Sequence, residues 1–223
     1  MAGEYKRCVS ERADPESGAR ACKQPVTGVM HVAGKPQFSL VLCGTVLFVA
    51  ALNAAAAEQP DMAALLKRMT LSPYSVSMRP PEFSGLTADG KSVSLAALRG
   101  RVVIVNFWAS WCYECRPEMP VFERLHREFG PRGLSVIAIN AREGAASVRA
   151  YARELRLTFP LVLDPRGKIN SAYGVIGLPT TFLIGRDGRA VALAIGPRKW
   201  GGKTARALIE ALLAGPPAPK GAP

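Results

Sequence analysis

Two cysteines three positions apart, Cys112 and Cys115, are the residues of this chain whose type and spacing best suit chemistry. They close almost no loop, so a bond between their sulfurs would constrain the unfolded chain little. At the start of a helix, this spacing places one sulfur a turn beyond the other, close enough for a disulfide. The pattern therefore favours reversible thiol–disulfide exchange over a structural crosslink.

The helix that would begin at these cysteines predicts different roles for them. Its unpaired N–H groups and partial positive charge stabilise a thiolate, so we expect Cys112 to be the exposed nucleophile. Cys115, inside the first turn, is expected to be shielded and to resolve the mixed disulfide. We expect no cofactor other than this redox-active disulfide. We also expect no metal, because zinc needs about four ligands and the chain beyond residue 57 offers only these sulfurs and His126.

An apolar run near the N-terminus predicts export. Residues 38–52 read FSLVLCGTVLFVAAL, follow a lysine and precede a series of alanines, which are the parts of a secretory signal peptide. We expect cleavage after Ala57, with an uncleaved membrane anchor as the alternative, because the run is marginally long enough to span a bilayer. Residues 1–29 lack these features, so we predict a start at Met30. Residues 1–57 would then form a preface and a signal peptide, and the domain would be periplasmic.

The remaining chain divides into three expected parts. Residues 58–81 are expected to be a linker that holds one short amphipathic helix over residues 61–69, because three prolines break any longer element. Residues 82–213 are expected to fold as one domain. Residues 214–223 are rich in Pro, Gly and Ala and are expected to be a flexible tail.

The domain itself predicts an α/β architecture. Continuous apolar runs at residues 102–108 and 134–140 indicate strands buried on both faces, and helical spacing follows each run. D-G turns at residues 88–91 and 186–189 predict an opening hairpin and a later one. Strands separated by helices pair in parallel, whereas hairpins add antiparallel strands. We therefore predict three α/β/α layers with a mixed central sheet and an N-terminal β-hairpin extension.

The chain carries a formal net charge of +12, mostly from scattered arginines. No basic block alternates with aromatic residues, so we predict no nucleic-acid binding. A solvated basic surface is the expected role of this charge, and weak attraction to anionic membranes or acidic partners is the alternative. We predict a monomer.

Two sequence motifs resemble those of thioredoxin-like proteins, most of all the exported TlpA/ResA/CcmG group with its redoxin, or AhpC/TSA-like, domain. Residues 106–120 read NFWASWCYECRPEMP, and residues 177–182 read GLPTTF. Two motifs in this order are far more specific than C-x-x-C alone. The resemblance covers residues 80–213 and implies a thioredoxin-like fold and a thiol–disulfide oxidoreductase that reduces protein disulfides.

The resemblance also implies site residues. Pro179 would be cis and pack against the disulfide, which would leave the backbone of Leu178 free to pair with an extended substrate. Trp111 is the expected exposed contact. Glu118 matches a glutamate that ResA-like proteins place near the active site, and it would accept the proton of Cys115 if burial raises its pKa toward neutrality. A surface glutamate is the alternative.

Two residues depart from the thioredoxin pattern. Thioredoxins carry a buried aspartate where this chain has Asn106, which cannot move protons. Glu114, between the cysteines, disfavours a neighbouring thiolate relative to a neutral residue, which argues mildly for a reducing protein.

The expected partners are a disulfide-bearing client protein and a membrane-embedded thiol reductant as electron donor. By resemblance, the client would be apocytochrome c, an oxidase copper-site protein or another thiol protein. A thiol peroxidase of the peroxiredoxin type is one alternative, although peroxiredoxins carry threonine where this chain has Ala109. A metal-binding chaperone is the other, and the shortage of histidine disfavours it.

Overall fold

The computed structural model describes residues 61–74 and 79–215. The predicted start at Met30, the export signal or anchor, and residues 216–223 of the predicted tail lie outside these ranges. No helix in the described ranges has the length and apolar character that a membrane crossing requires.

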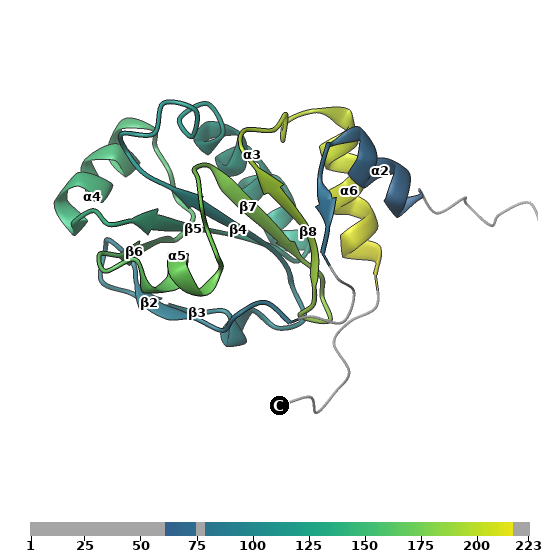
Figure 1. Cartoon of the computed structure of the whole chain (residues 1–223). Helices are drawn as coiled ribbons and strands as arrows, with labels where there is room; N and C mark the ends of the chain where they lie inside the picture. The colour runs from purple at the N-terminus through teal and green to yellow at the C-terminus, as the bar shows by residue number, and fades with distance from the viewer. Residues whose placement is uncertain (1–60, 75–78, 216–223) are drawn as a thin grey trace, which may run out of the picture. The chain divides into compact units, whose positions relative to one another are not determined.

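A six-stranded mixed sheet forms the centre of the described domain (Figure 1). Its strand order is β1-β8-β7-β4-β5-β6. Strands β4, β5 and β6 run parallel to one another. The pairs β4–β7, β7–β8 and β8–β1 are antiparallel. The predicted mixed α/β sheet is confirmed. The strands are β1 (Ser72–Pro73), β4 (Val102–Trp108), β5 (Leu134–Ala141), β6 (Leu161–Asp164), β7 (Thr180–Ile184) and β8 (Ala190–Ile195).

Helices cover both faces of this sheet. Successive side chains of β4 point to opposite faces, so the strand contributes to two separate cores. Ile104 and Trp108 join a core with residues of α2, α3, α4 and α6. Val105 and Phe107 join a second core with the opening hairpin and α5. The helices are α2 (Met62–Arg68), α3 (Met119–Phe129), α4 (Ala145–Glu154), α5 (Lys168–Ala172) and α6 (Lys203–Ala214), with 3-10 turns η2 (Ala96–Leu98) and η3 (Gly130–Arg132).

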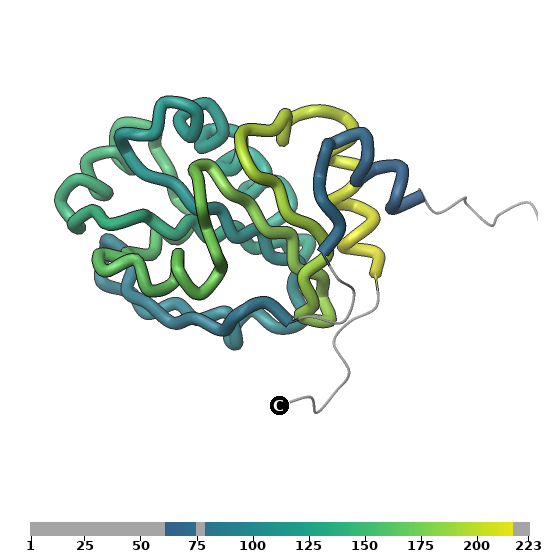
Figure 2. The backbone as a smooth tube through the Cα atoms, viewed as in Figure 1, coloured from purple at the N-terminus to yellow at the C-terminus, as the bar shows by residue number. Residues whose placement is uncertain are grey.

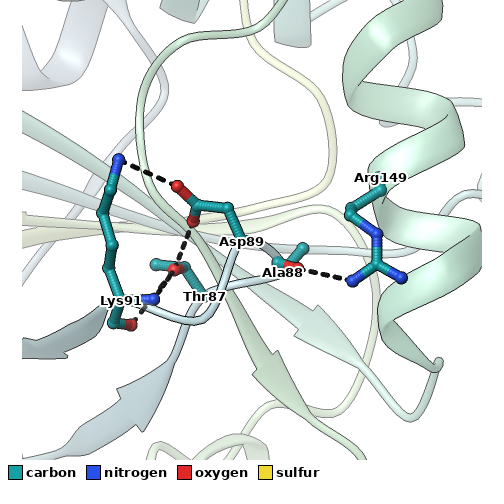
Figure 3. Close-up of polar contacts among 5 residues, drawn as sticks. All are labelled: Thr87, Ala88, Asp89, Lys91 and Arg149. Carbon is teal, nitrogen blue, oxygen red and sulfur yellow. Dashed lines mark hydrogen bonds and ion pairs between the residues drawn. The ribbon is translucent and has the colours of Figure 1, made fainter.

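The predicted opening hairpin is formed by β2 (Ser84–Leu86) and β3 (Ser92–Ser94). Figure 3 shows how polar contacts close its turn: the Thr87 hydroxyl donates to the Asp89 carboxylate at 2.5 Å, and the Lys91 ammonium pairs with the same carboxylate at 2.9 Å. Arg149 of α4 donates to the Ala88 carbonyl at 2.8 Å. The first two contacts stabilise the turn itself, and the Arg149 contact ties the hairpin to α4.

Residues 58–81 contribute structure to the domain where we expected a linker. The predicted amphipathic helix forms as α2, and Figures 1 and 2 show it beside α6, with Leu65 and Leu66 buried. Strand β1 then pairs with β8 and forms one edge of the sheet. The prolines do prevent a longer element, but Pro73 is tolerated because an edge strand does not need every N–H. The domain therefore begins about twenty residues before the predicted boundary.

Candidate active site

The segment between β4 and α3 holds both cysteines. We expected a helix from Cys112 onward, but α3 begins only at Met119. The preceding residues form successive tight turns, in which the N–H of Cys115 donates to the carbonyl of Cys112 at 3.2 Å. Pro117 is the physical reason, because proline has no N–H to donate and disfavours helical geometry in the residue before it. A turn N–H, rather than the N-terminus of a long helix, therefore faces the Cys112 sulfur.

The two cysteines form a disulfide with a Cα–Cα distance of 5.3 Å. Their exposure differs, with 7% for Cys112 and 1% for Cys115. The N–H of Cys115 also donates to the sulfur of Cys112 at 3.2 Å, as a donor to a thiolate would. Cys112 is thus less exposed than we predicted, and it is reached through a groove beside it.

The second motif lies where β7 begins. The Leu178–Pro179 peptide bond is cis, as the resemblance implied. The Pro179 carbonyl accepts from Gly196 at 2.8 Å, and the Thr180 hydroxyl donates to the Gly177 carbonyl at 2.7 Å, so the turn is held on both sides. Within the described chain, no hydrogen bond uses the backbone N–H or C=O of Leu178.

Leu178 and Cys112 border the same open groove of about 450 Å³. Two large apolar side chains stand exposed on its rim, Trp111 at 71% and Ile176 at 88%. The groove therefore combines a reactive sulfur, unpaired backbone groups and apolar surface. The remaining lining residues are Ala141, Arg142, Asn170, Ser171, Val175 and Gly177.

Glu118 is buried, with only 4% of its surface exposed. Its Oε1 accepts from the backbone N–H of Arg198 at 2.7 Å and from the indole N–H of Trp200 at 2.8 Å. Its Oε2 is buried without a hydrogen-bond partner among the described residues. Burial raises the pKa of this carboxyl to about 7, and the two donated hydrogen bonds and the nearby Arg198 charge oppose the rise without cancelling it. The surface-glutamate alternative is wrong.

Trp200 is a site residue that the sequence reading missed. It is 1% exposed and packs against Phe122 of α3, with ring centroids 5.7 Å apart. A lone tryptophan in the glycine- and proline-rich segment 196–202 was the available signal. The distance of 82 positions from Glu118 concealed the contact, because only the chain's return between β8 and α6 brings them together.

Glu143 was also missed. Its carboxylate accepts from the backbone N–H of Ser110 at 2.7 Å, from the Ser110 hydroxyl, and from the Asn140 side chain at 2.7 Å. Ser110 lies two residues before Cys112, so Glu143 fixes the approach to the active-site turns from the end of β5.

Asn106 lies inside β4, where it is 1% exposed. Its side-chain amide donates to the Thr181 hydroxyl of β7 at 2.9 Å. This contact joins the strand that leads to the cysteines with the strand that follows Pro179. In the described ranges, no three His, Cys, Asp or Glu side chains gather as a metal site would require.

Comparisons with known proteins agree with this geometry. ResA of Geobacillus thermodenitrificans, a thiol-disulfide oxidoreductase, is 35% identical over 122 residues, which cover 55% of this chain and 70% of that protein. ResA of Bacillus thuringiensis subsp. konkukian is 37% identical over 111 residues, 50% of this chain. This chain matches 64% of that relative's length, less than two thirds.

A solved structure shares the fold. The crystal structure described as thiol:disulfide interchange protein DsbE of Chlorobium tepidum matches with a TM-score of 0.58 and 29% identity, over 63% of this chain and 99% of that one. A profile of the AhpC/TSA family matches residues 76–192, just over half of the sequence. The chain therefore belongs to the AhpC/TSA family, and it is similar to the thiol-disulfide oxidoreductase ResA and to the solved DsbE structure, whose thioredoxin-like fold it shares.

Proposed function

We propose that this protein is a thiol–disulfide oxidoreductase that reduces the disulfides of client proteins. The observation that carries the proposal is the inequality of the two sulfurs: Cys112 borders an open groove, whereas Cys115 is 1% exposed behind it. An attacking thiol must reach a bulky partner, and a resolving thiol must reach only its neighbour. The names of the ResA and DsbE relatives support the same activity.

The proposed reaction transfers two electrons. In the reduced protein, the Cys112 thiolate attacks one sulfur of the client disulfide, which forms a mixed disulfide and releases the other client sulfur as a thiolate. The Cys115 thiolate then attacks the Cys112 sulfur, forms the bond seen in this structure and releases the second client sulfur. Solvent protons complete the client thiols, and an outside thiol reductant restores the dithiol.

In this cycle, Glu118 would receive the proton of the Cys115 thiol. With a pKa of about 7, both its ionised and its protonated forms are populated near neutral pH, as a group that accepts and returns a proton requires. Glu118 follows Cys115 by one turn, and its N–H donates to the Cys115 carbonyl at 3.1 Å. The side-chain amide of Asn106 does not ionise, so Glu118 is the proton acceptor in this cycle.

We further propose that the protein works in the periplasm, with a membrane-embedded thiol reductant as its electron donor. The apolar run at residues 38–52 supports export. Clients in the maturation of cytochrome c or of an oxidase copper site fit such a reductant, because a thiol in an oxidising compartment must be reduced before a cofactor attaches.

The test follows single turnovers of the reduced protein with a disulfide-bridged peptide, using free thiol and intact mass as readouts. The wild type should release two peptide thiols and regain its disulfide. Cys115→Ser should stop as a mixed disulfide between Cys112 and one of the two linked peptide chains, and Cys112→Ser should not react. Equal turnover by Cys112→Ser would overturn the proposal.

Hydrogen peroxide in place of the peptide tests the peroxidase alternative. Ala109 is fully buried and, three residues before Cys112, has no hydroxyl to offer a peroxide. We therefore expect oxidation by peroxide to be much slower than oxidation by the peptide disulfide. Faster oxidation by peroxide would favour the peroxidase.

A further inference from the structure

The groove beside Cys112 is lined by one charged side chain. Among the described residues that border it, only Arg142 carries a charge, and the others are apolar or neutral polar. A single cation within an apolar groove gives a binding partner both a charge to match and a surface to cover.

The fold presents Arg142 at a fixed place. It directly follows β5, its N–H donates to the Asp164 carbonyl at 3.1 Å, and its φ of 61° lies in the left-handed region that arginine seldom adopts. Its side chain lies against Gly167, where an added Cβ would come within 2.9 Å of Nε. The absence of a side chain at Gly167 therefore leaves room for this guanidinium.

The charge of Arg142 is unpaired within the described chain. Glu143, the next residue, and Asp164, whose carbonyl accepts from the Arg142 N–H, both direct their carboxylates to other partners. No hydrogen bond or ion pair joins its guanidinium to a described residue. The Asp164 carboxylate accepts from the Asn170 backbone at 2.9 Å and from its side-chain amide at 2.8 Å. The Glu143 carboxylate accepts from the Ser110 backbone N–H and from the Asn140 side-chain amide.

We propose that Arg142 selects clients that carry an acidic residue close to the cysteine that Cys112 attacks. This inference rests on the proposed function and names the substrate class of the same site. An extended client strand would pair with the free backbone of Leu178, cover Trp111 and Ile176 with an apolar side chain, and place a carboxylate on Arg142. A guanidinium suits this role because its planar N–H groups can bind a carboxylate through two hydrogen bonds.

The size of the effect follows from the position of Arg142. Its side chain is exposed, so its attraction for a carboxylate is moderate and screened by salt. We expect about a fivefold preference at low ionic strength, mostly in the rate of association. A preference carried by charge should shrink as the salt concentration rises.

The experiment compares two disulfide-bridged peptides that differ only in Glu or Lys beside the cysteine. Second-order rate constants for oxidation of the reduced protein are measured at low salt and at 0.5 M salt, roughly the range over which exposed charges are screened. The wild type should favour the Glu peptide. Arg142→Gly, which accommodates the left-handed backbone, should react equally with both, and Arg142→Glu should favour the Lys peptide.

Arg153→Glu is the matched control. Arg153 is exposed on α4, makes no hydrogen bond or ion pair to a described residue, and borders a different hollow, so this variant makes the same change in net charge away from the groove. It should keep the wild-type preference.

Equal rates of the wild type with both peptides would overturn the inference while leaving the proposed function intact. A preference that Arg153→Glu abolishes as fully as Arg142→Glu would assign it to net charge and also overturn the inference. Failure of the wild type with both peptides would instead remove the proposed function itself.

Discussion

Two hollows flank the active-site turns, and they share no lining residue. The groove beside Cys112 is open and apolar, with the unpaired charge of Arg142 and the free backbone of Leu178. The hollow beside Glu118 contains a buried carboxylate whose Oε1 accepts two hydrogen bonds, from Arg198 and Trp200. One side leaves its polar groups available to a partner, and the other uses them to hold an ionisable group inside the protein.

One short segment thus borders two environments that place opposite demands on their polar groups. In the proposed cycle a client must bind and leave, so the polar groups of the groove must be able to hydrogen-bond with water whenever no client is bound. A carboxyl with a pKa near neutrality must be kept out of water, so it needs burial with only partial hydrogen bonding.

The reactivity of the two thiols separates the two sides most strongly. After reduction, iodoacetamide should modify Cys112 on the order of a hundredfold faster than Cys115, because Cys112 borders the groove and receives the Cys115 N–H. Peptide mapping by mass spectrometry at short labelling times measures the ratio. Equal labelling of the two thiols would mean that the sulfurs are not distinguished by their surroundings.

Glu118→Gln should remove a pH dependence of stability. Because the pKa of Glu118 rises from 4.5 to about 7 on folding, the folded protein holds a proton that the unfolded chain releases between these values. Titration of Glu118 should therefore lower the stability of the wild type as the pH rises from 4.5 to 7, by at most roughly 3 kcal/mol, with no further change from this group above pH 7. Glutamine does not titrate, so the variant should gain stability relative to the wild type over this range.

Urea unfolding of the oxidised proteins at pH 4, 6 and 8 provides the comparison, since all other titrating groups are common to both. Unfolding free energies that run parallel with pH would contradict the buried-carboxyl account. The variant should also resolve mixed disulfides more slowly than the wild type at neutral pH.

Trp200→Phe tests the donor that holds Glu118. The change keeps an aromatic ring against Phe122 but removes the indole N–H, so we expect a loss of about 1–3 kcal/mol in unfolding free energy at pH 8, where Glu118 is mostly ionised. In the Glu118→Gln background the same change should cost less, because the partner is no longer charged. A double-mutant cycle measures this coupling, and additive effects would show that the indole N–H does not stabilise the Glu118 carboxylate.

Trp111→Ala should have the smallest effect on stability. The side chain is 71% exposed, so the free energy of unfolding should change by less than about 0.5 kcal/mol. Reaction with a disulfide peptide should slow more than reaction with a small disulfide such as oxidised dithiothreitol, because only the peptide covers the groove. Tyr113→Ala is the control, since Tyr113 is 88% exposed but borders the other hollow.

Local patterns predicted much of the domain correctly. The run VVIVNFW became the fully buried strand β4, and both D-G turns close hairpins. The helix at residues 61–69 was also predicted, but not that it packs beside α6, because nothing near it in sequence identifies its partner. The helix predicted from Cys112 failed for a local reason, the proline at position 117, which the motif made easy to overlook.

The candidate site divides in the same way. The cysteines, Pro179 and Glu118 belong to two recognisable motifs, so they could be predicted as site residues from the sequence. Arg142 and Glu143 come from the loop after β5 and Trp200 from the loop after β8, and no spacing rule connects them with the motifs. Their contribution follows from the ends of β5 and β8 lying near the active-site turns.

The amino-acid sequence specifies which atoms can react: two sulfurs at disulfide spacing, a carboxyl one turn on, and a proline able to adopt the cis form. These are covalent and short-range properties, set within a few bonds or one turn of chain. The tertiary structure alone shows how deeply each sulfur is buried, whether the carboxyl is kept from water and which charge lines the groove. Burial and electrostatic surroundings depend on segments far apart in the chain, so no local pattern contains them.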